Sequence, residues 1–438
     1  MKKIAIIGFG FCGRIAFANL VKSYKSNYEV IVFDEVEKNF SGDVLHSAAF
    51  SEFSPHYILN VTAKKMTAIV EEEQHFCQFL QQNYPQVWQE VGELGFAPRQ
   101  IYGYYLQKIS DESFLSAKEK EMKVSLIKNK VVGVEQDKSK KFFLLTDSEG
   151  KTYKSDEIII ATSFKQTSLP FAVEGKNVVQ YLWNQNYIDF HNNNFSNQKI
   201  ALLGSGLTAV DVIVGLKKKG FNGKITVISR RGNFPKSHFC FLEELPNFIS
   251  KEDSKNGLLF LCLKIRKFLR QNPKFDLRYV IHSIKPITVD LWYNFDERNK
   301  KLFLRLMPYW TIFRHRAPQS SIEIIDQMIA AGNLEIKNGG LISVEKESDK
   351  ILLKTKKEVL EVDYLVNCLG FEFKAQKYPL LKQMLDSELL KNDLLMVQSN
   401  HDKIHLLGGL NVGKDFECTA VPDMLLGIIE VVKKCSSC

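Results

Sequence analysis

Two glycine-rich stretches contain the residues whose types and spacing most directly indicate chemistry. In the first, "IIGFGFCGRI", Gly8, Gly10 and Gly13 follow a short β-branched run with the spacing G-x-G-x-x-G. In this motif the first glycine allows a tight turn, the second lets the backbone approach a pyrophosphate, and the third lets the helix pack closely on the strand. The helix that starts there offers N–H groups and a positive dipole end to phosphates. The stretch therefore predicts a dinucleotide-binding loop.

An acidic residue ends the strand that we expect next. That strand is "YEVIVFDE", and Asp34 stands at its end, where a carboxylate accepts a hydrogen bond from a ribose hydroxyl. The other interpretation of the N-terminus, a secretion signal, needs an unbroken apolar stretch and a small-residue cleavage site. Arg14 interrupts the stretch and no such site follows Leu20. We therefore expect a strand, a phosphate loop and a helix.

The same pattern occurs a second time along the chain. "NQKIALLGSGLTAVDVIVGL" again predicts a strand, a glycine loop and a helix. Its glycines are Gly204 and Gly206, Ala209 takes the third position, and Thr208 falls in the first turn of the helix. The sequence therefore predicts two dinucleotide sites.

The two predicted sites differ in charge at one equivalent position. The strand after the second loop, "KITVISRRG", ends at Arg230 and Arg231. Arg230 follows Gly204 by 26 positions, the same offset that separates Asp34 from Gly8. An acid there suits the free ribose 2′-hydroxyl of FAD or NAD, and arginine suits a 2′-phosphate. We predict FAD in the first site and NADPH in the second. A solvated surface pair is the alternative for the two arginines.

The remaining strand signals predict how the two sites share the chain. "SDEIIIATS" and "VDYLVNCLG" each have a polar start, a buried run and a small-residue exit, and "HLLGGL" is a late strand. "FECTAVPDMLLGIIEVV" predicts a turn and a helix with Pro422 in its first turn. We expect an α/β fold with two Rossmann-like domains, the NADPH domain inserted in the FAD domain. The predicted boundaries are FAD domain 1–165, NADPH domain 166–370 with a helical insert at about 236–320, and FAD-domain return 371–438.

Less regular stretches allow more than one interpretation. Residues 125–154 contain two strand-like runs, "SLIKNKVVGVEQ" and "KFFLLTDSEGKTY". The second has a D-S-E-G turn signal and resembles the small β-insert of flavin domains. The run "LLFLCLKIRKFLR" is amphipathic and basic, so it is either a helix packed on its domain or a membrane-surface helix.

Bulk composition excludes several classes of protein. The 438 residues suffice for two or three domains, and 45% are hydrophobic, as is usual for globular chains. No apolar run is long enough for stable insertion across a bilayer. The eight cysteines form no disulfide framework, and no zinc spacing is present, so we expect no metal and a cytoplasmic location. The net charge of +9 is mild, and no nucleic-acid signature accompanies it. The sequence gives no indication of oligomeric state.

Several segments, in order from Met1 to about Val432, resemble one known family. They are "SPHYILNVTAKKMTA", "FAPRQIYGYYL", "GSGLTAVD", "RRGNFPKSH", "MPYWTIFRHRAP", "IAAGNLEIKNGGLISVE" and "FECTAVPD". The sequence is similar to the bacterial FAD/NAD(P)-binding oxidoreductases of mostly unassigned activity, which are related to flavin-containing and amine N-hydroxylating monooxygenases. It departs from the family at Ser163 and Leu369, where a glycine and a threonine are usual, and at Val44-Leu45. It also lacks the F-x-G-x-x-x-H fingerprint of flavin-containing monooxygenases.

The resemblance implies roles for individual residues. Asn60, Arg99 and His238 are the predicted catalytic residues: Asn60 at the flavin edge, Arg99 on a phosphate or carboxylate, and His238 near the nicotinamide or substrate. Asn60 is also a predicted cofactor contact, and the further ones are Met66, Tyr102, Thr162 and Thr419. A turn-capping role for Asn60 and structural roles for Arg99 and His238 are the alternatives.

These features together predict an FAD-dependent NADPH oxidoreductase. In the preferred interpretation it is a monooxygenase that hydroxylates a small nucleophilic, amine-like substrate. One alternative is a flavin reductase of a disulfide, a quinone or a protein partner, and another is a non-catalytic flavin-bound sensor or interaction protein. For the one close cysteine pair, Cys435 and Cys438 in "KKCSSC", we expect a disordered tail; a mobile dithiol or a prenylation box is the alternative.

Overall fold

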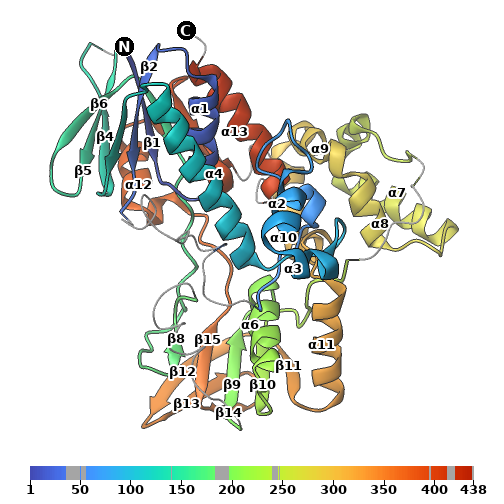
Figure 1. Cartoon of the computed structure of the whole chain (residues 1–438). Coiled ribbons are helices and arrows are strands. Elements are labelled where there is room, and N and C mark those ends of the chain that lie inside the picture. The colour runs from blue at the N-terminus through green and yellow to red at the C-terminus, as the bar shows by residue number, and fades with distance from the viewer. Residues whose placement is uncertain are drawn as a thin grey trace. The chain divides into compact units, whose positions relative to one another are not determined.

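The computed structural model describes residues 1–35, 50, 56–139, 141–182, 197–238, 245, 247–393, 396–411 and 420–436. The chain divides into two compact units (Figure 1). Unit 1 comprises Met1–Lys165 and Phe371–Cys438, and unit 2 comprises Gln166–Gly370. Unit 2 is thus inserted in the sequence of unit 1.

A five-stranded parallel sheet forms the centre of unit 1. Its order is β18-β7-β1-β2-β3. The strands are β1 (Lys2–Ile7), β2 (Tyr28–Phe33), β3 (Val124–Ile127), β7 (Glu157–Ile160) and β18 (Ile404–Leu406). Ile7 pairs with both Phe33 and Ile160, so the carboxyl ends of the three central strands meet at one edge. Loops that leave this edge are where parallel α/β sheets place their ligands.

The alternation of side chains along each strand covers both faces of this sheet. Ile4 and Ile6 pack with α1 (Phe11–Ser23), α4 (Arg99–Glu119) and α13 (Val421–Ser436), which lie on one face (Figure 1). Ala5 and Ile7 point to the opposite face, where they join the core of α12 (Pro379–Asp386) and a small antiparallel sheet. Both faces are buried, as a parallel sheet requires.

The small antiparallel sheet corrects one expectation. Its strands, in the order β4-β5-β6, are β4 (Val131–Gln136), β5 (Phe143–Asp147) and β6 (Thr152–Ser155). The run "SLIKNKVVGVEQ", which we expected to be a single strand-like run, is divided instead at the polar residues 128–130. Its first part is β3, which pairs with β2 in the parallel sheet, and its second part is β4.

The other elements of unit 1 are short and connect these layers. They are α2 (His75–Asn83), α3 (Pro85–Val91), β16 (Leu390–Asp393) and β17 (Met396–Ser399), together with single-turn helices at Ala63–Lys65, Ala375–Lys377 and Gly408–Asn411.

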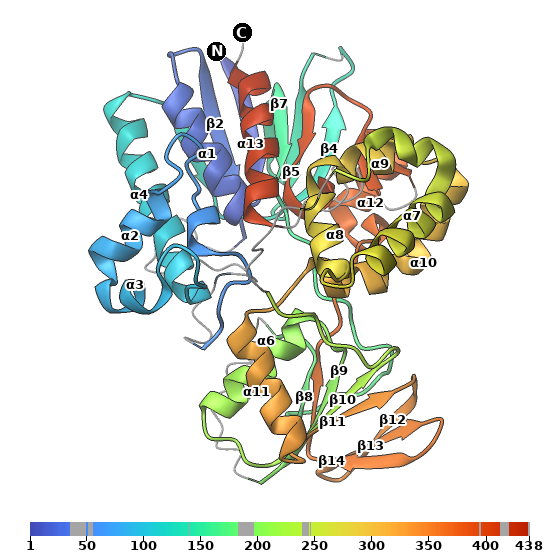
Figure 2. The same cartoon turned by 90° about the vertical axis from the view of Figure 1, so that its right-hand side faces the viewer.

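Unit 2 repeats the plan of unit 1 with a second five-stranded parallel sheet. Its order is β11-β10-β9-β15-β8. The strands are β8 (Val178–Val179), β9 (Lys199–Leu203), β10 (Lys224–Ser229), β11 (Leu334–Asn338) and β15 (Tyr364–Asn367). Figure 2 shows α6 (Leu207–Lys218) and α11 (Gln319–Ala330) beside this sheet. Residues of the antiparallel strands β12 (Leu341–Glu347), β13 (Lys350–Thr355) and β14 (Val359–Val362) pack on its other face.

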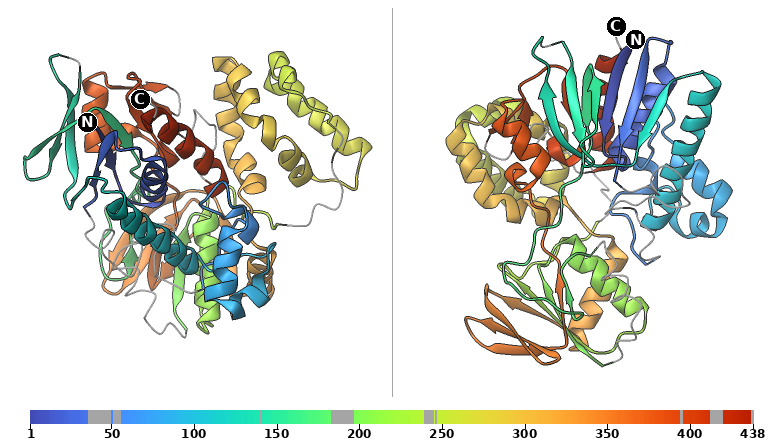
Figure 3. Two further views of the ribbon diagram at one scale, coloured as in Figure 1. Left: turned by 45° about the horizontal axis from the view of Figure 1, so that its top comes forward. Right: turned by 90° about the vertical axis from the view of Figure 1, so that its left-hand side faces the viewer.

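A group of helices is inserted between β10 and β11 (Figure 3). They are α7 (Gly257–Gln271), α8 (Leu277–Ser283), α9 (Thr288–Asn294) and α10 (Glu297–Arg314), with single-turn helices at Lys251–Asn256 and Lys285–Ile287. The Asp276 and Asp296 carboxylates cap α8 and α10 by accepting backbone N–H bonds. On α7, Leu258 and Leu261 are buried whereas Leu259 and Leu263 are exposed. No helix among the described residues is both long enough and apolar enough to cross a membrane.

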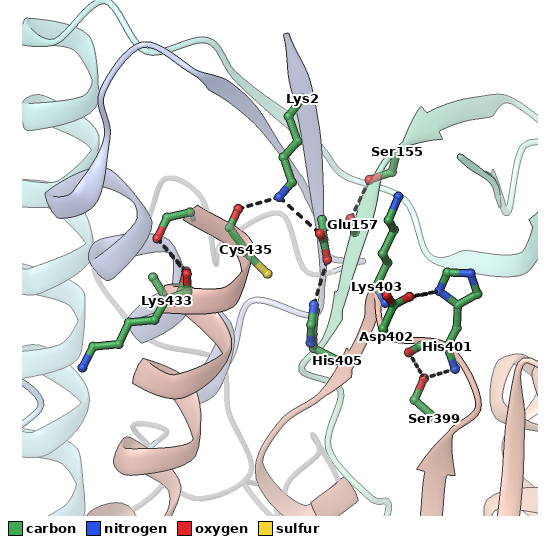
Figure 4. A network of polar contacts seen from close by, with 12 residues as sticks. Lys2, Ser155, Glu157, Ser399, His401, Asp402, Lys403, His405, Lys433 and Cys435 are labelled. Carbon is green, nitrogen blue, oxygen red and sulfur yellow. Dashed lines mark hydrogen bonds and ion pairs between the residues drawn. The ribbon is translucent and has the colours of Figure 1, made fainter. Parts of the chain in front are cut away.

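The C-terminal segment differs from the disordered tail that we expected. Helix α13 continues to Ser436, and Cys435 is fully buried in the core of unit 1. The Lys2 ammonium donates a 2.8 Å hydrogen bond to the carbonyl of Cys435 (Figure 4). The expectation is therefore wrong for Cys435, and Cys438 lies outside the described residues.

A buried polar network holds this end of α13 against the sheet. Lys2 Nζ lies 3.2 Å from Glu157 Oε1, and His405 Nε2 donates to Glu157 Oε2 at 2.8 Å (Figure 4). Glu157, His405 and Cys435 offer atoms of metal-ligating types within 4.8 Å of one another, but the cation that pairs with the carboxylate is Lys2. Lys2, Glu157 and His405 stand at or near the amino ends of their strands, at the edge opposite the glycine loop. The network is therefore structural.

Replacing Glu157 with Gln should lower the free energy of unfolding by about 2 kcal/mol at neutral pH, because Lys2 then lacks its anionic partner in a mostly buried place. Burial raises the pKa of Glu157, but the hydrogen bond from His405 and the charge of Lys2 outweigh this effect and lower it. A lowered pKa stabilises the folded state above the unfolded-state value of about 4.3, and this stabilisation is lost as the pH falls through the folded-state pKa.

Urea unfolding of the wild type and Glu157→Gln over a pH series should show their difference shrinking below about pH 4. The matched control is Glu430→Gln, which breaks an exposed pair with Lys434 on the same helix and should have almost no effect. Equal losses in the two variants would show that the Glu157 network contributes no more than a surface ion pair.

Candidate dinucleotide-binding sites

The first glycine loop has the shape that a pyrophosphate site requires. Gly8 has a φ of +96°, and a Cβ there would lie 3.0 Å from the carbonyl oxygen of Ala161. A Cβ on Gly13 would overlap the carbonyl oxygen of Gly8, so helix and turn touch through bare backbone. At Gly10 the position of a Cβ is open, and no side chain caps α1 at this residue. The loop therefore leaves space over the N–H groups of α1, and it fits a dinucleotide.

Asp34 is positioned by the same loop. The Gly8 N–H donates to the carbonyl of Phe33 at 2.8 Å, and the Phe9 N–H donates to Asp34 Oδ2 at 2.6 Å. The carboxylate therefore lies at the mouth of the turn, directly after β2. Its contact with a ribose remains a prediction, and its observed contribution is to fix the turn.

Arg14 is a supporting residue that the sequence reasoning did not identify. It is fully buried, its Nε donates to the carbonyl of Phe9 at 3.1 Å, and its Nη1 donates to Gln107 Oε1 at 2.9 Å on α4. Burial lowers the pKa of Arg14 to about 10, while the negative charges of Asp111 and Asp34 oppose that effect. Arg14 thus links the phosphate loop to α4. A charged side chain among the apolar residues of a buried helix was the available sequence signal.

The second loop repeats the geometry of the first with one substitution. Gly204 has a φ of +112°, and a Cβ there would lie 2.5 Å from the carbonyl oxygen of Cys368. The Cβ position at Gly206 is open, and α6 starts after it without a side-chain cap. Ala209 is fully buried in the third position, and Thr208 lies in the first turn of α6. This loop also fits a dinucleotide.

The predicted 2′-phosphate arginines are connected to the second loop. The Ser205 hydroxyl donates to the carbonyl of Asn233 at 2.7 Å and so ties the glycine loop to the segment after β10. Arg230 is exposed, and Arg231 is partly buried with its guanidinium 5.1 Å from the ring centroid of Tyr309. Ser205 and Tyr309 are contacts that the sequence reasoning missed. Because serine is common in loops, the sequence carried little signal for Ser205.

Two segments that carry the family resemblance run side by side in unit 1. The Leu59 N–H donates to the carbonyl of Ala97, and the Arg99 N–H donates to that of Tyr57, both at 2.8 Å. Asn60 is therefore brought near the start of α4. The Arg99 Nε donates to the carbonyl of Ile58 at 3.1 Å, so this guanidinium helps to hold the two segments together. Anion binding by Arg99 and flavin contact by Asn60 remain predictions.

The other predicted residues of unit 1 occupy different environments. Met66 and Tyr102 are buried in the hydrophobic core. Burial raises the pKa of Tyr102 well above its ordinary value, and its hydroxyl has no hydrogen-bond partner among the described residues. Thr162 is partly buried, and its backbone nitrogen lies 3.1 Å from the position that a Cβ on Gly8 would take. Thr419 and the Val44-Leu45 pair lie outside the described residues.

His238 belongs to unit 2, whereas Asn60 and Arg99 belong to unit 1. The His238 N–H donates to the carbonyl of Ala317 at 2.8 Å, which holds this segment against the residues that follow α10. Its predicted role toward nicotinamide or substrate remains a prediction.

Four of the described cysteines have thiols that are not activated. Cys12, Cys77, Cys262, Cys368 and Cys435 form no disulfide. Burial raises the pKa of Cys12 to about 12 and also raises the pKa of Cys77, Cys262 and Cys368. Reactive cysteines instead have a lowered pKa and partial exposure. These four thiols are therefore unsuited to disulfide exchange at neutral pH.

Comparisons with known proteins agree with this geometry. The family model for FAD-NAD(P)-binding proteins matches residues 5–165. The model for L-lysine 6-monooxygenase/L-ornithine 5-monooxygenase matches residues 98–247. Among curated proteins, none matches this sequence.

Solved structures resemble the chain along almost its whole length. The ornithine N-hydroxylase of Kutzneria sp. 744 is 14% identical with a TM-score of 0.68, and the match covers 99% of this chain and 98% of that chain. The FAD-bound cadaverine monooxygenase of Erwinia amylovora is 12% identical with a TM-score of 0.67, covering 99% and 94%. A bacillithiol disulfide reductase of Staphylococcus aureus is 13% identical with a TM-score of 0.52, covering 99% and 98%.

The resemblance and the fold class expected from the sequence are confirmed. The two family models correspond to the expected FAD/NAD(P)-binding oxidoreductases and amine N-hydroxylating monooxygenases. The α/β fold, with two parallel sheets that each carry a glycine loop, is the fold class expected for a two-dinucleotide-binding flavoprotein. The match over residues 5–165 also confirms the expectation of FAD and a nicotinamide nucleotide as cofactors of an oxidoreductase.

Two glycine substitutions should separate the folding and binding roles of the first loop. Gly10→Val places its side chain in the open space of the cradle, so the protein should fold normally and purify with little flavin. Gly13→Ala forces Cβ against the Gly8 carbonyl, so it should lower both thermal stability and flavin content. Absorbance of bound flavin and the thermal unfolding midpoint are the two measurements.

Gly427→Ala is the matched control, because a Cβ at this helical glycine meets nothing within 4 Å. It should keep full flavin content and stability. A Gly10→Val protein that retains stoichiometric FAD would exclude this loop as the pyrophosphate site.

Proposed function

We propose that the protein is an FAD-dependent, NADPH-using monooxygenase that hydroxylates the nitrogen of a small amine. The observation that carries the proposal is the pair of glycine cradles with opposite charges after the second strand, Asp34 in unit 1 and Arg230 with Arg231 in unit 2. The match of residues 98–247 to lysine and ornithine monooxygenases supports the reaction type. The neighbours at TM-scores of 0.68 and 0.67 are named as an ornithine N-hydroxylase and a cadaverine monooxygenase.

The residues of each unit have distinct parts in this scheme. In unit 1, Gly8, Gly10 and Gly13 would hold the FAD pyrophosphate at the start of α1, and Asp34 would accept a ribose hydroxyl. In unit 2, Gly204 and Gly206 would hold the NADPH pyrophosphate, and the arginines would bind the 2′-phosphate. FAD bound in unit 1 would supply the redox chemistry, namely acceptance of a hydride from NADPH and activation of molecular oxygen.

The proposed residues around the reaction act by binding and orientation. Asn60 would donate an amide N–H to the flavin edge from the segment that Arg99 holds at the carbonyl of Ile58. Because Arg99 is positively charged, it would also attract a substrate carboxylate. His238 would contribute from unit 2 toward the nicotinamide. These assignments depend on the family resemblance and on the local geometry of each segment.

The disulfide-reductase alternative has less support. Such an enzyme needs a reactive thiol, and burial raises the pKa of Cys12, the cysteine within the first phosphate loop, to about 12. The disulfide-reductase neighbour matches with a TM-score of 0.52, below those of the hydroxylases. A non-catalytic sensor would not need the arginines of the second site to select NADPH for turnover.

The direct test is NADPH-dependent oxygen consumption with a panel of ornithine, lysine, cadaverine and putrescine. The flavin-loaded protein should consume oxygen faster with at least one amine and yield a hydroxylamine that mass spectrometry identifies by one added oxygen atom. Unchanged oxygen consumption with every amine, together with turnover of a disulfide or quinone, would replace the proposal with the reductase alternative.

Coenzyme preference gives a second prediction. Charge-assisted bonds to a phosphate contribute roughly 1.5–3 kcal/mol each, so NADPH should bind about ten- to a hundredfold more tightly than NADH per engaged arginine. Changing Arg230 and Arg231 together to Ala should remove most of this preference, because only the binding of NADPH is weakened. High salt should also reduce the preference.

Stopped-flow flavin reduction with each nucleotide measures the effect. The control is Lys236→Ala, which removes an exposed cation a few residues along the same segment. It should change the rate of flavin reduction with neither nucleotide. If NADPH and NADH are equivalent in the wild type, the arginines are surface charges.

A further inference from the structure

The backbone that carries Arg231 is held in a fixed place beside the second glycine loop. Gly232 turns the chain with a φ of +64°, and its N–H donates to the Ser229 hydroxyl at 2.9 Å. Ser205, inside the glycine loop, bonds to the carbonyl of Asn233 at 2.7 Å. The Cα of Arg231 therefore has a defined position relative to the site proposed for the coenzyme pyrophosphate.

The last helix of the insert is fastened to the same segment. The Lys236 N–H donates to the carbonyl of Ile312 at 2.9 Å, and the Ala317 N–H donates to the carbonyl of Lys236 at 3.0 Å. Tyr309 precedes Ile312 by three residues on α10, so it stands on the same side of the helix. The backbone bonds thereby hold Tyr309 beside Arg231.

The contact between these two side chains is a cation–π interaction. The Arg231 guanidinium lies 5.1 Å from the ring centroid of Tyr309, inside the range of about 6 Å in which the ring face attracts a cation. No acidic side chain among the described residues pairs with Arg231. An aromatic face orients the guanidinium without neutralising its charge, and it leaves the in-plane N–H groups available for a bidentate phosphate.

Arg230 has no comparable support. Its side chain is exposed, and the part of the chain that the structure describes provides neither an aromatic ring nor a carboxylate for it. Binding a phosphate would therefore cost Arg230 more side-chain freedom than it costs Arg231. The two neighbouring arginines should contribute unequally to coenzyme choice.

We propose that Tyr309 is a positioning residue for coenzyme selection, whose ring holds Arg231 where the 2′-phosphate of NADPH binds. This inference rests on the proposed use of unit 2 for NADPH. It gives the helical insert a part in the coenzyme site, although the insert is distant in sequence from both the glycine loop and the arginines.

The test is a calorimetric titration of the FAD-loaded protein, once with NADP⁺ and once with NAD⁺, which gives the affinity for each nucleotide. Tyr309→Leu removes the aromatic face, so affinity for NADP⁺ should fall about two- to fivefold while affinity for NAD⁺ stays unchanged. Tyr309→Phe keeps the face and should behave as the wild type. In Arg231→Ala, adding Tyr309→Leu should cause no further loss for NADP⁺.

Each other outcome has a distinct meaning. Equal losses for both nucleotides in Tyr309→Leu would show that the ring stacks on the adenine and would overturn the positioning role. Full retention of the NADP⁺ preference would overturn it too. If the wild type binds NADP⁺ and NAD⁺ equally well, both the proposed use of NADPH and this inference are wrong. The proposed reaction is tested separately, by hydroxylation of an amine.

Calorimetry gives the stoichiometry and the dissociation constant separately, so a partly unfolded variant lowers the stoichiometry of both titrations without being mistaken for a loss of affinity. If Tyr309→Leu does not fold, Tyr309→Gln removes the ring with a polar side chain that suits this half-exposed position. The thermal unfolding midpoint of each variant should stay near that of the wild type.

Discussion

Close approach of bare backbone at the turn after the first strand is the constraint on which both halves of this chain depend. A Cβ at Gly13 would overlap the carbonyl of Gly8, and one at Gly204 would press on the carbonyl of Cys368. The middle glycine of each loop, Gly10 or Gly206, borders open space instead. The close contacts at Gly13 and Gly204 build the cradles, and the open space at Gly10 and Gly206 leaves them accessible. The glycines of one motif therefore perform different tasks.

The other features of each unit position this cradle and give it a charge. Parallel strands align their carboxyl ends at one edge, so the residue that ends the second strand comes beside the loop. Asp34 there is already bonded to the loop through the Phe9 N–H, and Ser205 ties the second loop to the segment of Arg231. At the opposite edge of unit 1, the Lys2–Glu157–His405 network fastens α13, which returns from the far end of the sequence. Binding chemistry and structural support thus occupy opposite ends of the strands.

Local sequence patterns predicted the two loops and their strands because glycine spacing and β-branched runs act over a few residues. They did not predict Arg14, Ser205 or Tyr309, whose partners Gln107, Asn233 and Arg231 depend on tertiary structure. The expectation for the C-terminus failed for a different reason. The buried face of α13, formed by Val421, Leu425, Ile428, Val432 and Cys435, keeps helical spacing to its end, but the short polar ending "KKCSSC" suggested a tail. The helical periodicity of these apolar residues was the better signal for the structure of the C-terminus.

The central claim is that one chain uses two similar cradles for two different dinucleotides, and a crystal structure with FAD and NADP⁺ tests it most directly. The account predicts the FAD pyrophosphate over Gly10 at the start of α1 and the NADP⁺ pyrophosphate over Gly206, with the 2′-phosphate on Arg231. A structure with FAD over Gly206, or with the 2′-phosphate directed away from Arg231, would contradict it.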